Sequence, residues 1–108
     1  MINANLEQFL DTGWYNEATL YYNGYIYWCE GSWDMSKEKP MHFVVYRFPA
    51  RIINDKYYER IETSDPYEYV YDIWGSGEAD VKEEFLQAKI FEGKSFWEVE
   101  RELGWYEE

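Results

Sequence analysis

Cysteine and histidine are almost absent from this chain, which has one of each, Cys29 and His42, among its 108 residues. A single cysteine excludes an intramolecular disulfide and a zinc site built on cysteines, and it favours a reducing compartment. We therefore expect a cytoplasmic protein. One histidine leaves little for metal binding, and no spacing of carboxylates indicates a metal site or a cofactor.

Long apolar runs, a basic leader and positive charge are also lacking. No stretch approaches the roughly 20 apolar residues of a membrane-spanning helix. The opening segment MINANLEQFL has no basic start followed by an apolar run, so we expect no signal peptide. Ten Lys and Arg stand against 22 Asp and Glu, a net charge of -12. Such a charge disfavours nucleic acid and anionic membranes as direct partners and favours a basic protein.

Aromatic residues, in contrast, are abundant: six Trp, twelve Tyr and six Phe. One small core does not need so many, and Tyr and Trp combine an apolar body with a polar tip. We therefore expect some of them at a surface that contacts another molecule. The chain length predicts one domain over residues 1–108.

The segment TLYYNGYIYWCE carries the clearest local signal. Asn23-Gly24 between aromatic and β-branched runs predicts a hairpin with a two-residue type I′ turn. The register of that turn places six uncharged residues on one face, which we assign to the core: Ala18, Leu20, Tyr22, Tyr25, Tyr27 and Cys29. The other face is mixed and holds Thr19, Tyr21, Ile26, Trp28 and Glu30.

Further strands are predicted at 42–48, 57–61 and 67–74. Residues 31–40 have the composition of a loop, Pro49 should end the strand before it, and Ser64-Asp65-Pro66 indicates a turn.

Helical signals flank this β-rich part. A short amphipathic helix is predicted over residues 3–12, with Asn5 as its cap. After Gly75-Ser76-Gly77, one helix should bury Val81, Phe85 and Ala88. A second helix should begin at the Ser95–Glu98 capping box and bury Phe96, Val99 and Leu103. The prediction is an α+β fold, an antiparallel sheet of about five strands with a short N-terminal helix and two C-terminal helices.

Residues for catalysis are scarce. Cys29 and His42 are the one available thiol–imidazole pair, but the hairpin register points Cys29 into the core, where a thiol is inert. No nucleophile elbow, phosphate loop, HExxH or EF-hand pattern is present. Two carboxylates in a cleft remain as a route to glycosidic hydrolysis, but a short chain leaves little room for one. We expect a protein that is not an enzyme.

Negative charge is concentrated toward the C-terminus, where residues 78–108 hold ten acidic and four basic residues, half of the net charge. Two like-charged pairs at i,i+4, Asp80 with Glu84 and Glu98 with Glu102, each cost roughly 0.2–0.5 kcal/mol in a helix. Such pairs fit a solvated face or an acidic face that meets a basic partner. The candidate contacts are Asp80, Glu83, Glu84, Glu98 and Glu102, with Trp97 and Trp105 as apolar anchors.

A short, cysteine-poor, strongly acidic and Tyr-rich chain resembles the small inhibitors encoded by phages and mobile elements, among them DNA-mimic and anti-CRISPR proteins. The resemblance rests on size and composition over the whole chain, matches no family motif and transfers no functional residue. It implies a non-enzymatic inhibitor that occupies the nucleic-acid site of a basic partner.

Two alternatives rest on the aromatic residues. Tyr67, Tyr69 and Tyr71 on one face of a strand would form a platform for a carbohydrate or another small ligand, unless helices cover that face as core. The aromatic surplus would otherwise suit a homodimer interface. Four further residues beside loop or terminal signals are expected to be exposed: Trp14, Tyr15, Trp33 and Trp105.

Overall fold

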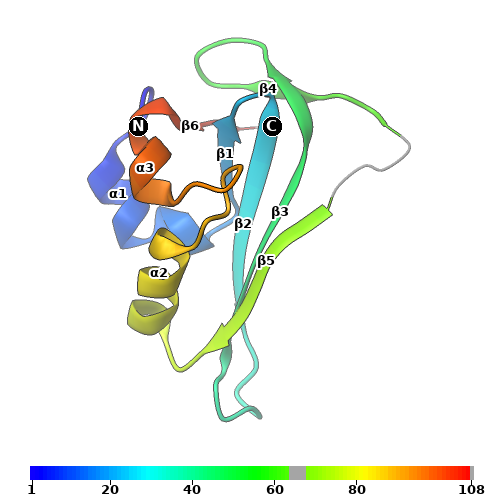
Figure 1. Cartoon of the computed structure of the whole chain (residues 1–108). Helices are drawn as coiled ribbons and strands as arrows, with labels where there is room; N and C mark the ends of the chain where they lie inside the picture. Colours follow the sequence, from blue (N-terminus) through cyan, green and yellow to red (C-terminus); the bar gives the residue numbers. More distant parts are fainter. Residues whose placement is uncertain (64–67, 108) are drawn as a thin grey trace.

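Six strands and three short helices make up the computed structural model, which describes residues 1–63 and 68–107 (Figure 1). The strands are β1 (Ala18–Tyr22), β2 (Tyr25–Trp33), β3 (Met41–Ile52), β4 (Tyr58–Arg60), β5 (Glu68–Gly75) and β6 (Gly104–Trp105). The helices are α1 (Leu6–Asp11), α2 (Glu78–Gln87) and α3 (Phe96–Val99), and single 3-10 turns follow α1 at Gly13–Tyr15 and α3 at Glu100–Glu102.

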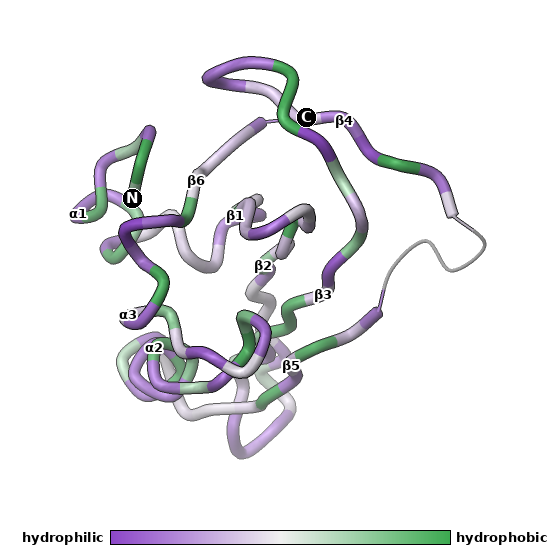
Figure 2. Tube along the Cα trace, turned by 45° about the horizontal axis from the view of Figure 1, so that its top comes forward, coloured by the Kyte–Doolittle hydropathy of each residue, from purple (hydrophilic) through white to green (hydrophobic). Residues whose placement is uncertain are grey.

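All strand pairs in the sheet are antiparallel, in the order β4-β3-β2-β1-β6, with β5 also beside β3. The long strand β3 pairs with β5 through its first half and with β4 through its last three residues, which curls the sheet. Helices α1, α2 and α3 lie together on one side of it in both views (Figures 1 and 2). The predicted α+β fold is confirmed.

The hairpin register is confirmed in full: Ala18 pairs with Cys29, Leu20 with Tyr27, and Tyr22 with Tyr25. Asn23 and Gly24 have φ angles of 51° and 90°, as a type I′ turn requires. A side chain at φ above zero is strained unless the residue is glycine or a short polar residue such as asparagine. The local turn therefore determines which residues of β1 and β2 reach the core.

The main core lies between the sheet and the helices. From the sheet it receives Leu20, Tyr27, Cys29, Phe43 and Val45, all fully buried. The helices supply most of the stripes predicted for them, with Phe9, Phe85 and Phe96 at zero exposure. Ala88 is only partly buried and caps the end of α2, and the buried Leu103 follows the 3-10 turn after α3. Phe9 stacks on Phe96 with ring centroids 5.4 Å apart, which ties the first helix to the last. Aromatic residues thus form much of the core.

A second, smaller core occupies the other face where the sheet curls. Its members are Ile26, Phe48, Ala50, Tyr58 and Tyr106. Ile26 is fully buried there, on the hairpin face that the sequence marks as mixed. Both faces of the sheet are therefore covered at this end, and only part of the second face is open.

Several element boundaries differ from the sequence expectation. Strand β2 continues to Trp33, so the loop predicted over residues 31–40 is shorter than expected. Strand β6 pairs with β1, although its two residues are too few to show the alternating pattern of a strand. Pro49 lies inside β3 and does not end it. Its carbonyl accepts a hydrogen bond from the Ile61 N–H at 3.0 Å, so its nitrogen faces the β4 side of the strand, and the ladder between β2 and β3 loses no donor.

The predicted caps are present. The Asn5 side chain accepts a hydrogen bond from the Gln8 N–H at 3.0 Å and begins α1, which is shorter than the predicted 3–12. Ser95 accepts from the Glu98 N–H at 3.4 Å and begins α3. The predicted turn at Ser64-Asp65-Pro66 lies outside the described residues. No helix in the described part is both long and apolar enough to cross a bilayer.

Candidate functional site

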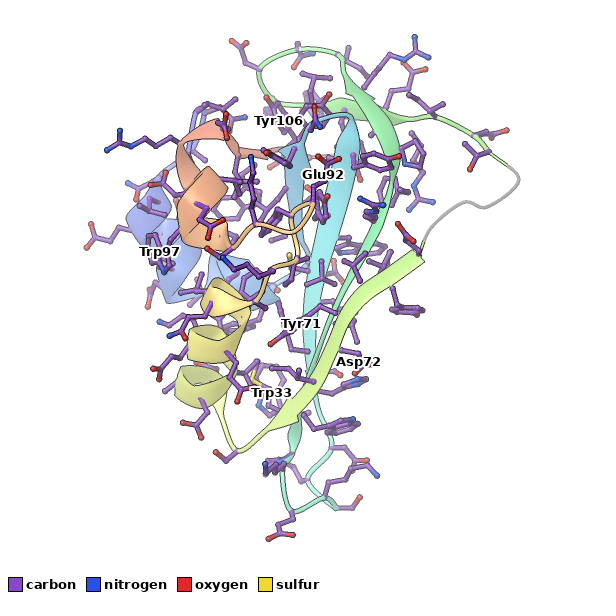
Figure 3. All side chains as sticks on the ribbon, in the orientation of Figure 1. Trp33, Tyr71, Asp72, Glu92, Trp97 and Tyr106 are labelled. Carbon is purple, nitrogen blue, oxygen red and sulfur yellow. The ribbon has the colours of Figure 1, made fainter. Side chains whose placement is uncertain are left out.

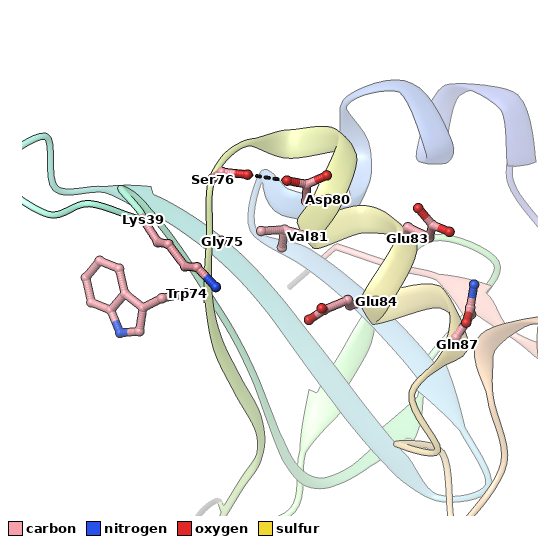
Figure 4. Close-up of a pocket in the computed structure, with 9 residues that line it drawn as sticks. All are labelled: Lys39, Trp74, Gly75, Ser76, Asp80, Val81, Glu83, Glu84 and Gln87. Carbon is pink, nitrogen blue, oxygen red and sulfur yellow. Dashed lines mark hydrogen bonds between the residues drawn. The ribbon is translucent and has the colours of Figure 1, made fainter.

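A pocket of about 340 Å³ opens between α2, the end of β5 and the loop that joins β2 to β3 (Figure 4). Three of the predicted contact residues, Asp80, Glu83 and Glu84, line it from α2. Trp74 lines it from β5, and Lys39 is the one cation among its lining residues. We call this site the acidic pocket.

Local sequence explains why α2 lies so close to β5. A Cβ on Gly75 would overlap the Val81 side chain, so glycine is needed for the strand to lead into the helix at this distance. The Ser76 hydroxyl then donates to the Asp80 carboxylate across the first turn of α2. Residues 80, 83 and 84 share one helix face because they are three and four positions apart. Val81 and Phe85, on the other side, enter the core.

The remaining predicted contacts lie on and after α3, and they differ in how far they are free to bind. Glu98 pairs with Lys89, and the hydrogen bond from Lys89 holds the pKa of Glu98 below its usual range. Its carboxylate also accepts from the Ser95 N–H, so this residue belongs to the helix cap. Glu102 is exposed and makes no ion pair with a described residue.

The two proposed anchors have different environments. Trp97 is 51% exposed and points away from the sheet on the outer side of α3 (Figure 3). Trp105 is partly buried: its ring lies edge-on to Phe9 at 5.5 Å and packs against Gly13. Trp97 is therefore the stronger candidate for an exposed anchor.

The exposure predicted for aromatic residues beside loops is confirmed for Trp33, which is 46% exposed, and wrong for Trp14. Trp14 is fully buried, with Phe43 at 5.0 Å and Phe85 at 6.2 Å between ring centroids. The 3-10 turn after α1 carries its indole under the sheet, and this placement has no signature in the local sequence. Tyr15 is partly buried.

Charge is unevenly divided between the layers. Residues 1–17 and 76–103, which we call the helical layer, hold 11 acidic and four basic residues, a net charge of -7. The remaining residues, 18–75 and 104–108, hold 11 acidic and six basic residues, a net charge of -5. Negative potential should therefore be strongest on the helix-covered side of the sheet.

The tyrosine platform predicted on β5 is not present as a row. The pairing of β5 with β3 shifts by one residue between Val45 and Tyr46, so Val70 forms a bulge. Tyr71 packs into the core against Phe43 and Phe85, whereas Tyr69 lies on the other face, 63% exposed. A bulge reverses the alternation of side chains. Tyr67 lies outside the described residues.

The bulge creates a different aromatic row that crosses three strands. Trp28 of β2, Tyr46 of β3 and Tyr69 of β5 follow one another with ring centroids 4.8 and 5.6 Å apart. The hairpin register predicts that Trp28 points away from the main core. Tyr69 lies on the same face as Trp28 only because of the bulge at Val70. This row lies on the face opposite the helices.

The single cysteine and the single histidine lie on opposite faces of the sheet. Cys29 is fully buried, and burial raises the pKa of its thiol. The ring of His42 stacks on Trp74 at 4.2 Å, and its Nε2 lies 2.6 Å from the Asp72 carboxylate. The two side chains therefore do not form a thiol–imidazole pair. No group of three or more potential metal ligands converges in the described part of the chain.

No protein-family model matches the chain, and no curated protein or solved structure is significantly similar to it. Function is therefore inferred from the acidic pocket, the charge of the helical layer and the exposed aromatic residues.

Proposed function

We propose that this protein is a non-enzymatic binding module whose helical layer engages a basic protein, at a surface which that partner uses for nucleic acid. The observation that carries the proposal is the acidic pocket, where Asp80, Glu83 and Glu84 gather around about 340 Å³ with Lys39 as the one lining cation. A partner Arg or Lys side chain would find several carboxylate acceptors there, and hydrogen bonds between charged groups are stronger than neutral ones.

The wider charge of the helical layer supports the same partner class. A net charge of -7 on this layer would steer a basic surface toward it, over a range set by the Debye length of about 8 Å at physiological salt. Half-exposed Trp97 would supply apolar contact area, since tryptophan is enriched among the residues that dominate binding. Carboxylates carry negative charge as phosphates do, and aromatic rings are flat as bases are. Together they suit a surface of the partner that normally binds nucleic acid.

Displacement of labelled DNA tests the proposal. A panel of DNA-binding proteins is loaded with a fluorescent duplex, and this protein is added as a competitor at low and at high salt. We expect displacement from at least one member, weakening as salt rises. Neutralising the pocket with Asp80→Asn, Glu83→Gln and Glu84→Gln should reduce it strongly.

The matched control removes the same charge elsewhere, with Asp55→Asn, Glu59→Gln and Glu62→Gln, all exposed and outside the helical layer. This control should retain most of the displacement. Equal losses in the two triple variants would show that net charge alone is responsible and would refute a specific acidic site. Displacement that is unchanged by salt would refute electrostatic recognition.

The aromatic row Trp28, Tyr46 and Tyr69 favours a second function, the binding of a planar or sugar ring on the open face of the sheet. Its support is the exposure of Tyr69 at the end of a cross-strand stack. Titration with a panel of glycans and nucleotides, followed by tryptophan fluorescence, tests it. Saturable quenching that Tyr69→Ala removes would support this function, and a silent panel would exclude it.

A further inference from the structure

A second cavity, of about 350 Å³, lies where the C-terminal segment runs from the edge of β1 to the start of β4. It shares no lining residue with the acidic pocket. Aromatic residues from three separate segments form much of its wall: Trp28 of β2, Tyr58 of β4 and Tyr106 beyond β6. Glu17 and Glu107 also line it. We call this site the C-terminal cage.

The walls of the cage are held by the fold itself. The Tyr106 N–H donates to the Thr19 carbonyl at 3.0 Å, and the Thr19 hydroxyl donates back to the Tyr106 carbonyl. The Tyr106 ring folds over Gly104, where an added Cβ would lie 2.9 Å from its Cζ atom. Tyr58 and Tyr106 both belong to the second core, 4% and 6% exposed. The cage is therefore preorganised before any ligand arrives.

Glu17 is unusual in its backbone and in its lack of a charge partner. Its φ of 54° places it in the left-handed region, which residues other than glycine, asparagine and aspartate seldom occupy. Strained positions of this kind cluster at functional sites. Glu17 makes no ion pair with any residue in the described ranges. The second carboxylate, Glu107, lies 3.9 Å from Lys56 in an exposed pair.

The charge beside the aromatic wall is negative, because Glu17 and Glu107 line the cavity and no Lys or Arg is among its lining residues. Burial, together with the charge of Asp55, raises the pKa of Tyr106. The surroundings of the cage are thus both aromatic and negative.

We propose that the C-terminal cage binds an organic cation, a guanidinium or a primary ammonium group, with the aromatic walls contacting its apolar parts and Glu17 balancing its charge. Aromatic faces attract such cations through their quadrupoles, and a nearby carboxylate adds a charged hydrogen bond. The cation is either a free small molecule or the side chain of an Arg or Lys in a peptide. The site is independent of the acidic pocket and of its proposed partner.

Matched ligands separate charge from shape. Ethylguanidinium and ethylurea are close in size and shape but differ in charge, and each is titrated against the protein by NMR or tryptophan fluorescence. We expect saturable binding of ethylguanidinium and none of ethylurea. Equal responses to the two ligands, or no saturable response to ethylguanidinium, would overturn the proposal.

Matched variants test the role of Glu17. Glu17→Gln removes its charge and should weaken ethylguanidinium binding roughly tenfold, as expected for the loss of one charged hydrogen bond. The control is Glu92→Gln, because Glu92 is exposed, also has a positive φ of 53°, and does not line the cage. Equal losses from Glu17→Gln and Glu92→Gln would overturn the assignment. Glu107→Gln provides a second test if Glu17→Gln does not fold.

Two further peptides identify the source of the cation. An acetylated Gly-Arg-Gly amide is compared with the same peptide carrying citrulline, which is neutral, in place of arginine. Tighter binding of the arginine peptide than of ethylguanidinium would support a peptide side chain, and the reverse order would support a free cation. Equal binding of the arginine and citrulline peptides would contradict cation recognition. The acidic-pocket variants should not change any of these titrations.

Discussion

Gly13→Ala should destabilise the fold through a single contact. Gly13 is buried in the 3-10 turn after α1, and its φ is not in the left-handed region, so alanine adds no backbone strain there. The added Cβ would lie 2.9 Å from Cζ2 of Trp105 and 3.1 Å from Cζ3. Real Cβ atoms essentially never come within 3.0 Å of another atom, so the indole ring must move.

The surroundings of Trp105 leave the ring little room to move. Phe9 meets it edge-on at 5.5 Å, and the Trp105 N–H donates to the Asn3 side chain at 2.8 Å. Overpacking of this kind costs about 1–3 kcal/mol. For a chain of this size each kcal/mol lowers the Tm by about 4–8 °C.

Urea unfolding, followed by circular dichroism and by tryptophan fluorescence, measures this cost. Gly77→Ala is the control, because nothing lies within 4 Å of an added Cβ there and the backbone is extended. Because Gly77 is the N-cap of α2, where alanine is less favourable than glycine, this control should cost no more than about 1 kcal/mol. In a Trp105→Leu background, Gly13→Ala should lose most of its effect, because the two residues interact directly. A Gly13→Ala protein as stable as the wild type would refute the packing of Trp105 against this turn.

Three further outcomes are expected. Burial, and then the charge of Glu84, raises the pKa of Tyr71 to about 12. Between about pH 10 and that value the phenol ionises in the unfolded chain but stays protonated in the folded protein. The free energy of unfolding should therefore fall above about pH 10, and it should fall less steeply in Tyr71→Phe. Trp14→Ala should cost about 3–5 kcal/mol in urea unfolding, whereas Trp97→Ala, at a half-exposed site, should stay within about 0.5 kcal/mol. Gly24→Ala meets no atom within 4 Å but has a φ of 90°, so it should cost about 1–2 kcal/mol, and equal stability would contradict the type I′ turn.

Sequence patterns were reliable where a few neighbouring residues determine the structure. Asn23-Gly24 has a strong turn preference, and the alternation around it then settles the faces of β1 and β2. The Ser95 cap and the stripe of Phe96, Val99 and Leu103 were likewise readable, because helix period and capping are local.

The candidate site was only partly predictable. Spacing placed Asp80, Glu83 and Glu84 on one helix face, and they line one pocket. Spacing could not show that Lys89 pairs with Glu98, because that contact depends on how the segment between α2 and α3 folds back. The C-terminal cage was not predictable at all, since Glu17 and Tyr106 come together only through the pairing of β6 with β1.

The sequence by itself determined the α+β class, the hairpin register, the inward position of Cys29 and the excess of negative charge. These follow from composition and from interactions between residues close along the chain. Tertiary structure alone decided that Trp14 is buried, that Tyr69 and Tyr71 lie on opposite faces, and that the C-terminal segment closes a cage against β1. Each of these depends on packing between distant segments. One bulge or one short strand there changes which side chains point into the core and which point to solvent.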